Sequence, residues 1–147
     1  MGVFLVLKVN LDLEKLKLKI INKDDYEFLF ELLCNRPKHT NISHKQMPSM
    51  IQHIKFINSK PYSKWYVVIY DKIRVGSTYL TKHNEIGLFI TPKWAWRGLE
   101  PKVLECIKEK NPRSMYYANV NPRNTKLINL FKKNGFTLIQ YTYELIN

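Results

Sequence analysis

Hydrophobic and polar positions along the first half of the chain change between a period of two and a period of about 3.6. Leu16, Leu18 and Ile20 interleave with lysines, which predicts a half-buried strand. Acidic residues at 24 and 25, and Pro48 further on, are typical of helix starts. Runs rich in aromatic and β-branched residues after Pro61 predict successive strands. The expected elements are a strand at 16–20, helices at 24–34 and 48–57, and strands at 65–69, 73–80 and 85–90.

The second half continues the alternation of strands and helices. A helix is expected from about Arg97 or Gly98 to Lys110, then a strand over 116–120. Asn124 is a typical N-cap, and Gly135 a typical helix end, for a further helix. Alternating apolar side chains predict a last strand over 136–145. We therefore expect a single domain, 1–147, of α+β class: a mixed, mostly antiparallel central sheet flanked by about four helices.

The first seven residues are apolar, but the run is short and lacks both a basic start and a small-residue cleavage site. They are expected to form a short initial strand. No apolar stretch approaches the roughly 20 residues that cross a bilayer. Cys34 and Cys106 lie in apolar surroundings, without disulfide or zinc-site spacing, and are expected to pack in the core. These features predict a cytoplasmic protein with no membrane partner and no metal.

Charge is the compositional outlier, with 24 Lys and Arg against 12 Asp and Glu, a net charge of +12. Such a surface attracts anions, including nucleic acids and phosphorylated small molecules. Nineteen of the 24 are lysine rather than the fork-shaped arginine favoured for phosphate recognition. The lysines are spread along the chain and no nucleic-acid-binding signature accompanies them, which disfavours a nucleic-acid partner.

Two segments carry more specific information. The first runs from Glu85 through Gly98 into the following helix, and an exposed helix N-terminus with a glycine suits pyrophosphate. The second has the spacing N-x-x-x-x-x-L-F-x-x-x-G-F, met by Asn124, Leu130, Phe131, Gly135 and Phe136. Together the segments resemble the GNAT superfamily of acetyl-CoA-dependent N-acetyltransferases. The resemblance covers nearly the whole chain, because the expected element order from residue 16 to 145 is also that of the family.

Three residues depart from the family pattern. Ala95 stands where the pyrophosphate loop usually has Arg or Gln, and Glu100 stands where a small residue lets the phosphates approach. Glu100 suits the helix dipole but repels phosphate if it points inward. Phe131 stands where many members place a Tyr that reprotonates the leaving thiolate.

The resemblance implies acetyl-CoA as cosubstrate and direct attack by an amine on the thioester. It implies Glu85 as the base that removes the amine proton, and Asn119 as a group that bonds pantetheine or polarises the thioester carbonyl. Main chain around Ile90 and Thr91 would pair with the pantetheine arm. The residues expected at the cofactor are Phe89, Ile90, Thr91, Trp96, Arg97, Gly98, Leu99, Asn124 and Phe131.

The acceptor is expected to be a small molecule with a primary amine, of amino-sugar or amino-acid type. Residues in the early loop and helix, and in the turn before residue 85, are candidates for contacting it, namely Arg36, His53, Tyr62 and His83. A monomer or a homodimer is consistent with the sequence. Two other functions stay open: a non-catalytic acyl-CoA-binding relative, motivated by Ala95, Glu100 and Phe131, and a basic module that binds nucleic acid or protein.

Overall fold

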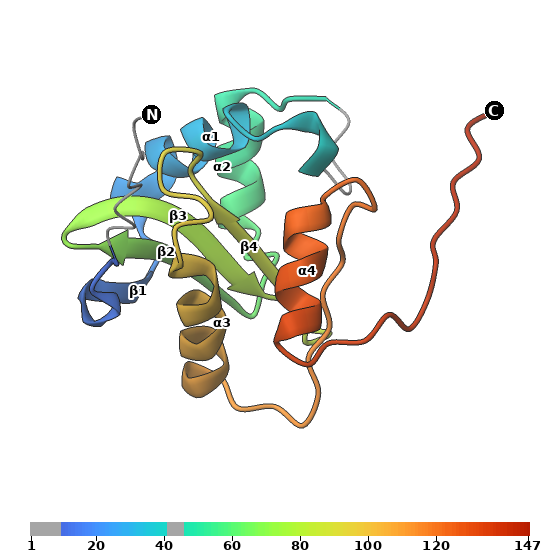
Figure 1. The fold of residues 1–147 in the computed structure, drawn as a ribbon. Coiled ribbons are helices and arrows are strands. Elements are labelled where there is room, and N and C mark those ends of the chain that lie inside the picture. Colours follow the sequence, from blue (N-terminus) through green and yellow to red (C-terminus); the bar gives the residue numbers. More distant parts are fainter. Residues whose placement is uncertain (1–9, 41–45) are drawn as a thin grey trace, which may run out of the picture.

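The computed structural model describes residues 10–40 and 46–147. Four strands and four α-helices follow one another in the order expected as far as residue 110 (Figure 1). Short 3-10 turns precede β1 and α1 and follow α1. The elements are β1 (Leu16–Ile20), α1 (Tyr26–Cys34), α2 (Met50–Asn58), β2 (Lys64–Tyr70), β3 (Ile73–Leu80), β4 (Ile86–Ile90), α3 (Leu99–Lys110) and α4 (Thr125–Lys133).

The sheet has the order β1-β2-β3-β4, and every neighbouring pair is antiparallel. A register shift between Val68 and Ile69 of β2 marks an irregularity in its pairing with β3. In the pairing of β3 with β4, Gly76 lies opposite Ile90. A Cβ on Gly76 would lie 2.4 Å from the Phe89 carbonyl oxygen, so only glycine permits this approach of β3 to β4.

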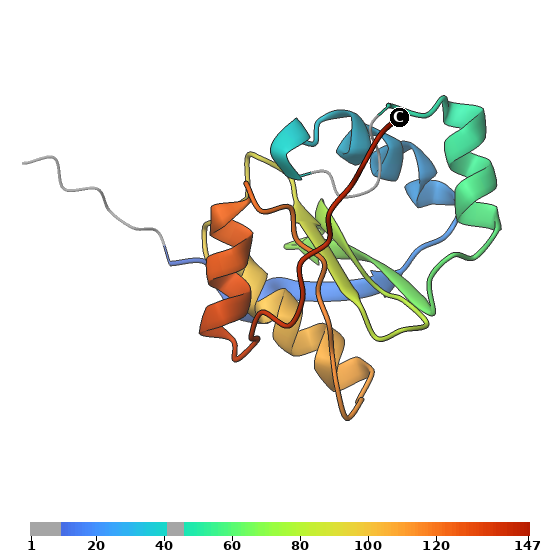
Figure 2. The same ribbon diagram turned by 90° about the vertical axis from the view of Figure 1, so that its right-hand side faces the viewer.

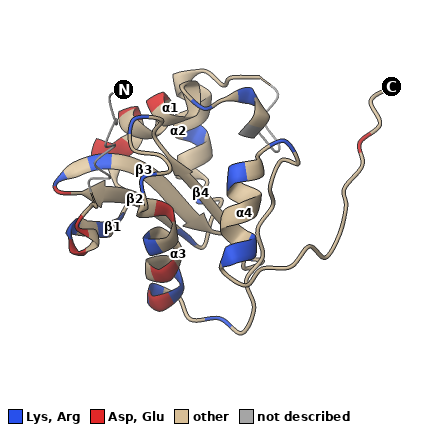
Figure 3. Ribbon diagram, viewed as in Figure 1, with Lys and Arg blue, Asp and Glu red and all other residues tan. Residues whose placement is uncertain are grey.

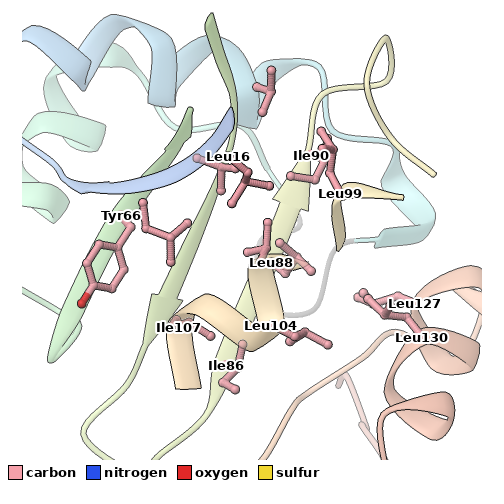
Figure 4. Close-up of a cluster of buried hydrophobic side chains, with 14 of the residues drawn as sticks. Leu16, Tyr66, Ile86, Leu88, Ile90, Leu99, Leu104, Ile107, Leu127 and Leu130 are labelled. Carbon is pink, nitrogen blue, oxygen red and sulfur yellow. The ribbon is translucent and has the colours of Figure 1, made fainter. Parts of the chain in front are cut away.

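Each face of the sheet is covered by helices, which explains why β2 reads as an almost continuous hydrophobic run. Val68 and its neighbours on one face pack against α3 and α4 in the larger core cluster (Figure 4). Val67, on the opposite face, packs with Leu29 of α1 and Ile57 of α2 in a smaller cluster. Figure 1 shows α1 and α2 together on one side and α3 on the other.

A buried carboxylate ties the start of α1 to the sheet. The Asp25 side chain is fully buried and accepts hydrogen bonds from Lys19 Nζ of β1 at 2.7 Å and Arg74 Nε of β3 at 2.9 Å. It also accepts from the Asn22 backbone N–H in a capping box. Burial acts to raise the pKa of Asp25, but these hydrogen bonds outweigh it and hold the pKa below its ordinary value.

Two of the expected strands are not formed in the described residues. Segment 116–120 makes one isolated parallel bridge, Tyr117 to Glu85, because it then diverges from β4 and the ladder cannot continue. Segment 136–145 is extended but pairs with no strand. Phe136 packs against the larger core, and the apolar side chains after it face solvent: Tyr143 is 90% and Leu145 84% exposed. Figures 1 and 2 show it leaving the body after α4. The strand expected at residues 1–7 lies outside the described residues.

The structure also shows how exposed the two cysteines are and how the basic residues are distributed. Cys34 is exposed and Cys106 half-buried, so the expectation of core packing is wrong for Cys34, which ends α1 beyond its buried face. Lys and Arg occur on several separate elements rather than on one face (Figure 3). Within the described ranges, no helix is both long and apolar enough to cross a bilayer.

We predict that Asp25→Asn strongly destabilises the fold. Removing one partner of a buried ion pair costs about 3–5 kcal/mol, and we expect the lower end because Lys19 and Arg74 are partly solvated. Since the folded pKa of Asp25 is lowered, its contribution is complete above pH of about 4 and is lost as pH falls through the folded value. Denaturant unfolding at pH 7 and at pH 3 should show this. Asp24→Asn, at the exposed neighbouring position, is the control; equal effects of the two substitutions would contradict the prediction.

Candidate functional site

A cavity of about 200 Å³ lies between α1 and α2 on one side and β4, segment 119–121 and α4 on the other. Residues of both the smaller and the larger hydrophobic cluster therefore contribute to its lining. Its walls are largely apolar, with amide, hydroxyl, imidazole and guanidinium groups among them. Among the residues that line it are Arg36, Gln52, His53, Phe56, Tyr62, Trp65, Ser77, Tyr79, Gly87, Phe89, Asn119, Asn121 and Phe131.

The cavity exists because β4 meets the following segment at only one point. The Ile86 N–H donates to the Tyr117 carbonyl at 2.7 Å, and the Tyr117 N–H donates to the Asn84 carbonyl at 2.9 Å. In an antiparallel ladder, alternate residues turn their N–H and C=O groups away from the partner strand. Leu88 and Ile90 therefore direct theirs away from β3, toward the open edge of β4. An extended chain with amide groups could pair there.

Glu85 lies at the closed end of this opening. It is half-buried, and its carboxylate accepts from Thr81 Oγ1 at 3.0 Å and from Asn119 Nδ2. Asn119 lines the cavity, whereas Glu85 is not among the lining residues. The structure thus brings the two expected catalytic residues into direct contact. The Asn119 amide fixes the carboxylate at the edge of the cavity.

Aromatic side chains form the wall of the cavity above the sheet. Tyr62 and Tyr79 stack face to face with ring centroids 3.8 Å apart, and Trp65 lies edge-on to Tyr62 at 4.8 Å. Trp65 Nε1 donates to Ser77 Oγ at 2.8 Å, which fixes the indole against β3. Gly87 makes this arrangement possible, because a Cβ there would lie 2.0 Å from Cζ of Tyr79.

Arg36 brings a positive charge to the same wall. Its guanidinium carbon lies 5.5 Å from the centroid of the Phe89 ring, a cation–π arrangement. Burial lowers the pKa of Arg36, which still leaves an arginine charged at neutral pH. Burial and the neighbouring Tyr79 raise the pKa of Tyr62, and burial raises that of Tyr79, so both phenols stay protonated. His53 is buried on the same side, 5.6 Å from the Phe30 ring.

The loop after β4 contains two residues in the left-handed backbone region. Trp96 has φ +62° and Gly98 has φ +101°, which turns the chain into α3. Gly98 has no atom within 4 Å of where its Cβ would be, so its left-handed conformation is what requires glycine. Thr91 is already engaged: its N–H donates to Val75 and its carbonyl accepts from Trp94 and Ala95. The backbone groups open to a ligand on β4 are those of Leu88 and Ile90.

The Glu100 carboxylate accepts hydrogen bonds from backbone N–H groups at the end of this loop. Its carboxylate is 3% exposed and accepts the Trp96 N–H at 2.6 Å, as well as its own backbone N–H. Burial raises the pKa of Glu100 despite these hydrogen bonds. The Glu100 side chain therefore points into the loop rather than toward solvent. Its carboxylate occupies backbone amides at the start of α3.

Of the other residues expected at the cofactor, one lines the cavity and the rest lie in the loop, in the core or at a helix cap. Phe131 lines the cavity and packs edge-on to Phe136, with centroids 4.9 Å apart. The Arg97 guanidinium lies over the Trp94 ring, 4.9 Å from its centroid. Leu99 and Ile90 bury their side chains in the larger core, which leaves only their backbone to a ligand. Asn124 Oδ1 accepts the Leu127 N–H as an N-cap.

Among the expected acceptor residues, Arg36, His53 and Tyr62 line the cavity, whereas His83 lies in an exposed turn outside it. Sequence reasoning missed Tyr79, Gly87 and Gln52. The period of two shows which face of its own strand Tyr79 or Gly87 lies on. Only the register between β3 and β4 shows that the two residues lie opposite each other. No metal-binding cluster of His, Cys, Asp or Glu occurs in residues 10–40 and 46–147.

No protein-family profile and no curated protein matches the chain. Solved structures do match its fold. A domain from Methanocaldococcus jannaschii is 17% identical, with a TM-score of 0.78 over 88% of this chain and 93% of that one. Spermidine N-acetyltransferase from Vibrio cholerae, in complex with CoA and spermine, is 18% identical, with a TM-score of 0.71 over 91% and 89%.

A third match is RimL, an alpha-N-protein acetyltransferase of a ribosomal protein, in complex with coenzyme A. It is 15% identical, with a TM-score of 0.69 over 86% of this chain and 82% of that one. The fold is thus that of GNAT acetyltransferases, as the closing motif indicated. At these identities the likeness is one of fold.

We predict that Gly87→Ala displaces the Tyr79 ring and destabilises the protein by about 1–3 kcal/mol, the usual cost of overpacking. The added methyl would overlap the ring, and Tyr79→Leu should relieve the overlap. A double-mutant cycle measured by denaturant unfolding checks this. The expected result is a much smaller cost of Gly87→Ala in the Tyr79→Leu background. Additive effects would show that the ring does not limit position 87.

Proposed function

We propose that this chain, which has the fold of the GNAT acetyltransferases, moves an acetyl group from acetyl-CoA to the primary amine of a small acceptor of amino-acid or amino-sugar type. The observation that carries the proposal is the open edge of β4 beside the cavity. The unpaired edge of β4 is suited to an arm that contains amide groups. The cavity beside it, called the chamber below, has polar and aromatic walls suited to an acceptor. Coenzyme A is bound by the Vibrio cholerae and RimL proteins of the same fold.

The residues present fit the pantetheine arm of this cosubstrate. The backbone groups of Leu88 and Ile90 supply donors and acceptors spaced as in a strand, and Asn119 and Asn121 line the other side of the opening. At the pyrophosphate end, Trp96, Gly98 and Arg97 would hold the diphosphate. There the Glu100 carboxylate must move away or take up a proton before the loop amides become available.

The chemistry follows from a neutral amine attacking the thioester carbonyl. A new C–N bond forms, the C–S bond breaks, the amine loses one proton and the thiolate gains one. Glu85 would accept the amine proton through a water molecule, because its carboxylate is held at the edge of the cavity and is not part of its lining. Asn119 holds Glu85 in position and presents its amide to the chamber.

A non-catalytic acyl-CoA-binding role is the second candidate. It is favoured by Phe131, which lines the cavity and has no hydroxyl to return a proton to the thiolate. Turnover separates the two candidates, because the second binds acetyl-CoA without releasing CoA.

We expect purified protein to release CoA from acetyl-CoA in the presence of an accepted amine, and Glu85→Gln to lower kcat about 100-fold or more. Loss of a general base costs this much, while the affinity for acetyl-CoA should stay within a few-fold. A thiol-release assay and calorimetry measure the two quantities. Glu109→Gln, an exposed change on α3, is the matched control. Unchanged kcat in Glu85→Gln would remove the base role, and binding without any CoA release would favour the second candidate.

We expect Glu100→Gln to bind CoA about 3- to 10-fold more tightly at pH 8, because an amide keeps the shape but removes the charge that opposes the diphosphate. The raised pKa of Glu100 fixes the pH dependence: as pH falls toward it, the wild-type carboxyl becomes neutral and CoA affinity rises. The variant should lack this rise. Calorimetry from pH 5 to 8 checks both, with Glu109→Gln as control; equal or weaker binding by Glu100→Gln would contradict the prediction.

A further inference from the structure

The chamber between α1, α2 and the sheet is lined by a positively charged side chain and by no acidic one among the described residues. Its charged lining residue is Arg36, and of the described residues that line it none is an aspartate or a glutamate. Glu85 lies at the edge and is held by Thr81 and Asn119. A polycationic acceptor would meet no carboxylate inside and would face the guanidinium.

Polar side chains line the chamber together with Arg36. The stacked Tyr62 and Tyr79 rings belong to the same lining. Burial raises the pKa of both phenols, which keeps them protonated. The Gln52 amide lines the same chamber. Charge-assisted bonds from a planar guanidinium are suited to a carboxylate or phosphate.

The walls around these donors are flat and apolar. Phe89 lies beneath the guanidinium, and Phe56 and Trp65 complete the aromatic side. Such rings accept an apolar or ring-shaped body but provide no second charge. Asn119, which contacts Glu85, lines the other wall of the same chamber. An acceptor with its anionic group at Arg36 would extend toward the open edge of β4.

We infer that the acceptor is an amine that also carries an anionic group, and that Arg36, with Tyr62 and Tyr79, selects it by binding that group. This inference rests on the proposed acetyltransferase function and deepens it. The anion is a carboxylate in an amino acid and a phosphate in an amino-sugar phosphate. Both present oxygens to the same donors. A polyamine is excluded as the preferred acceptor.

Matched acceptor pairs test the inference. L-phenylalanine is compared with 2-phenylethylamine, which lacks only the carboxylate, and glucosamine 6-phosphate with glucosamine; spermine is the polycation. In one of the two pairs, the anionic member should have a kcat/KM about 10- to 100-fold higher, as expected for a charge-assisted hydrogen bond. The pair that shows the preference identifies carboxylate or phosphate. Equal values within both pairs, or a preference for spermine, would overturn the inference.

Arg36→Gln should abolish this preference by lowering kcat/KM for the anionic member of the pair. Arg36→Lys, which keeps the charge but not the planar fork, should retain part of it. Arg113→Gln is the control, since Arg113 is exposed and bonds the Pro112 carbonyl outside the cavity. A preference that persists in Arg36→Gln would show that another group selects the anion.

Calorimetry with the same pairs, in the presence and absence of CoA, separates this inference from the proposed function. If CoA binds but no amine is acetylated, the acetyltransferase proposal fails. The affinity difference within each pair then still decides whether the chamber prefers an anionic amine. If amines are acetylated without regard to charge, only the selection by Arg36 fails.

Discussion

The isolated bridge between Glu85 and Tyr117 is the contact on which the candidate site depends. Two reciprocal backbone bonds join the chain to β4 at this point, and the segment then diverges. If pairing continued, β4 would become an interior strand and the cavity would close. Because it stops, the backbone groups of Leu88 and Ile90 point toward the edge of β4 where no strand is paired in the described residues. The bridge also brings Asn119 to Glu85, so one contact both opens the edge and positions the carboxylate.

The two buried carboxylates show how partners decide the behaviour of a charge. Asp25 is fully buried between two cations, and its pKa is lowered. Glu100 is almost as buried, but its partners are backbone N–H groups, and its pKa is raised. The first carboxylate fastens α1 to the sheet. The second completes a loop by supplying, from within the chain, the kind of oxygen that a bound phosphate would supply.

Local patterns in the sequence predicted the elements as far as residue 110 and the caps of α4. Periodicity and capping depend on neighbours in sequence, and Asn124 and Gly135 act as expected. The strand at 116–120 failed because pairing depends on where β4 runs, and the segment at 136–145 failed because alternation alone supplies no partner strand. Cys34 failed for a similar reason, since helical spacing places it near an apolar face but not inside it.

Sequence reasoning named several residues that the structure brings to one cavity. Arg36, His53 and Tyr62 do line one cavity, and the resemblance to a family pointed to Glu85 and Asn119, which are in contact. Tyr79 and Gly87 could not be found, because their relation depends on the register between β3 and β4. The direction of Glu100 also lay beyond sequence. A carboxylate at a helix start either faces solvent or folds back, and only the packing around it decides.

The separation of the two hydrophobic clusters has a consequence for how such a molecule can change over evolutionary time. The side of the cavity formed by α1 and α2 packs on the smaller cluster, around Leu29, Ile57 and Val67, whereas α3 belongs to the larger one. Substitutions in α1 and α2 can therefore alter the cavity while the packing of α3 is kept. The lining of the cavity can thus diverge while the fold that carries it is conserved.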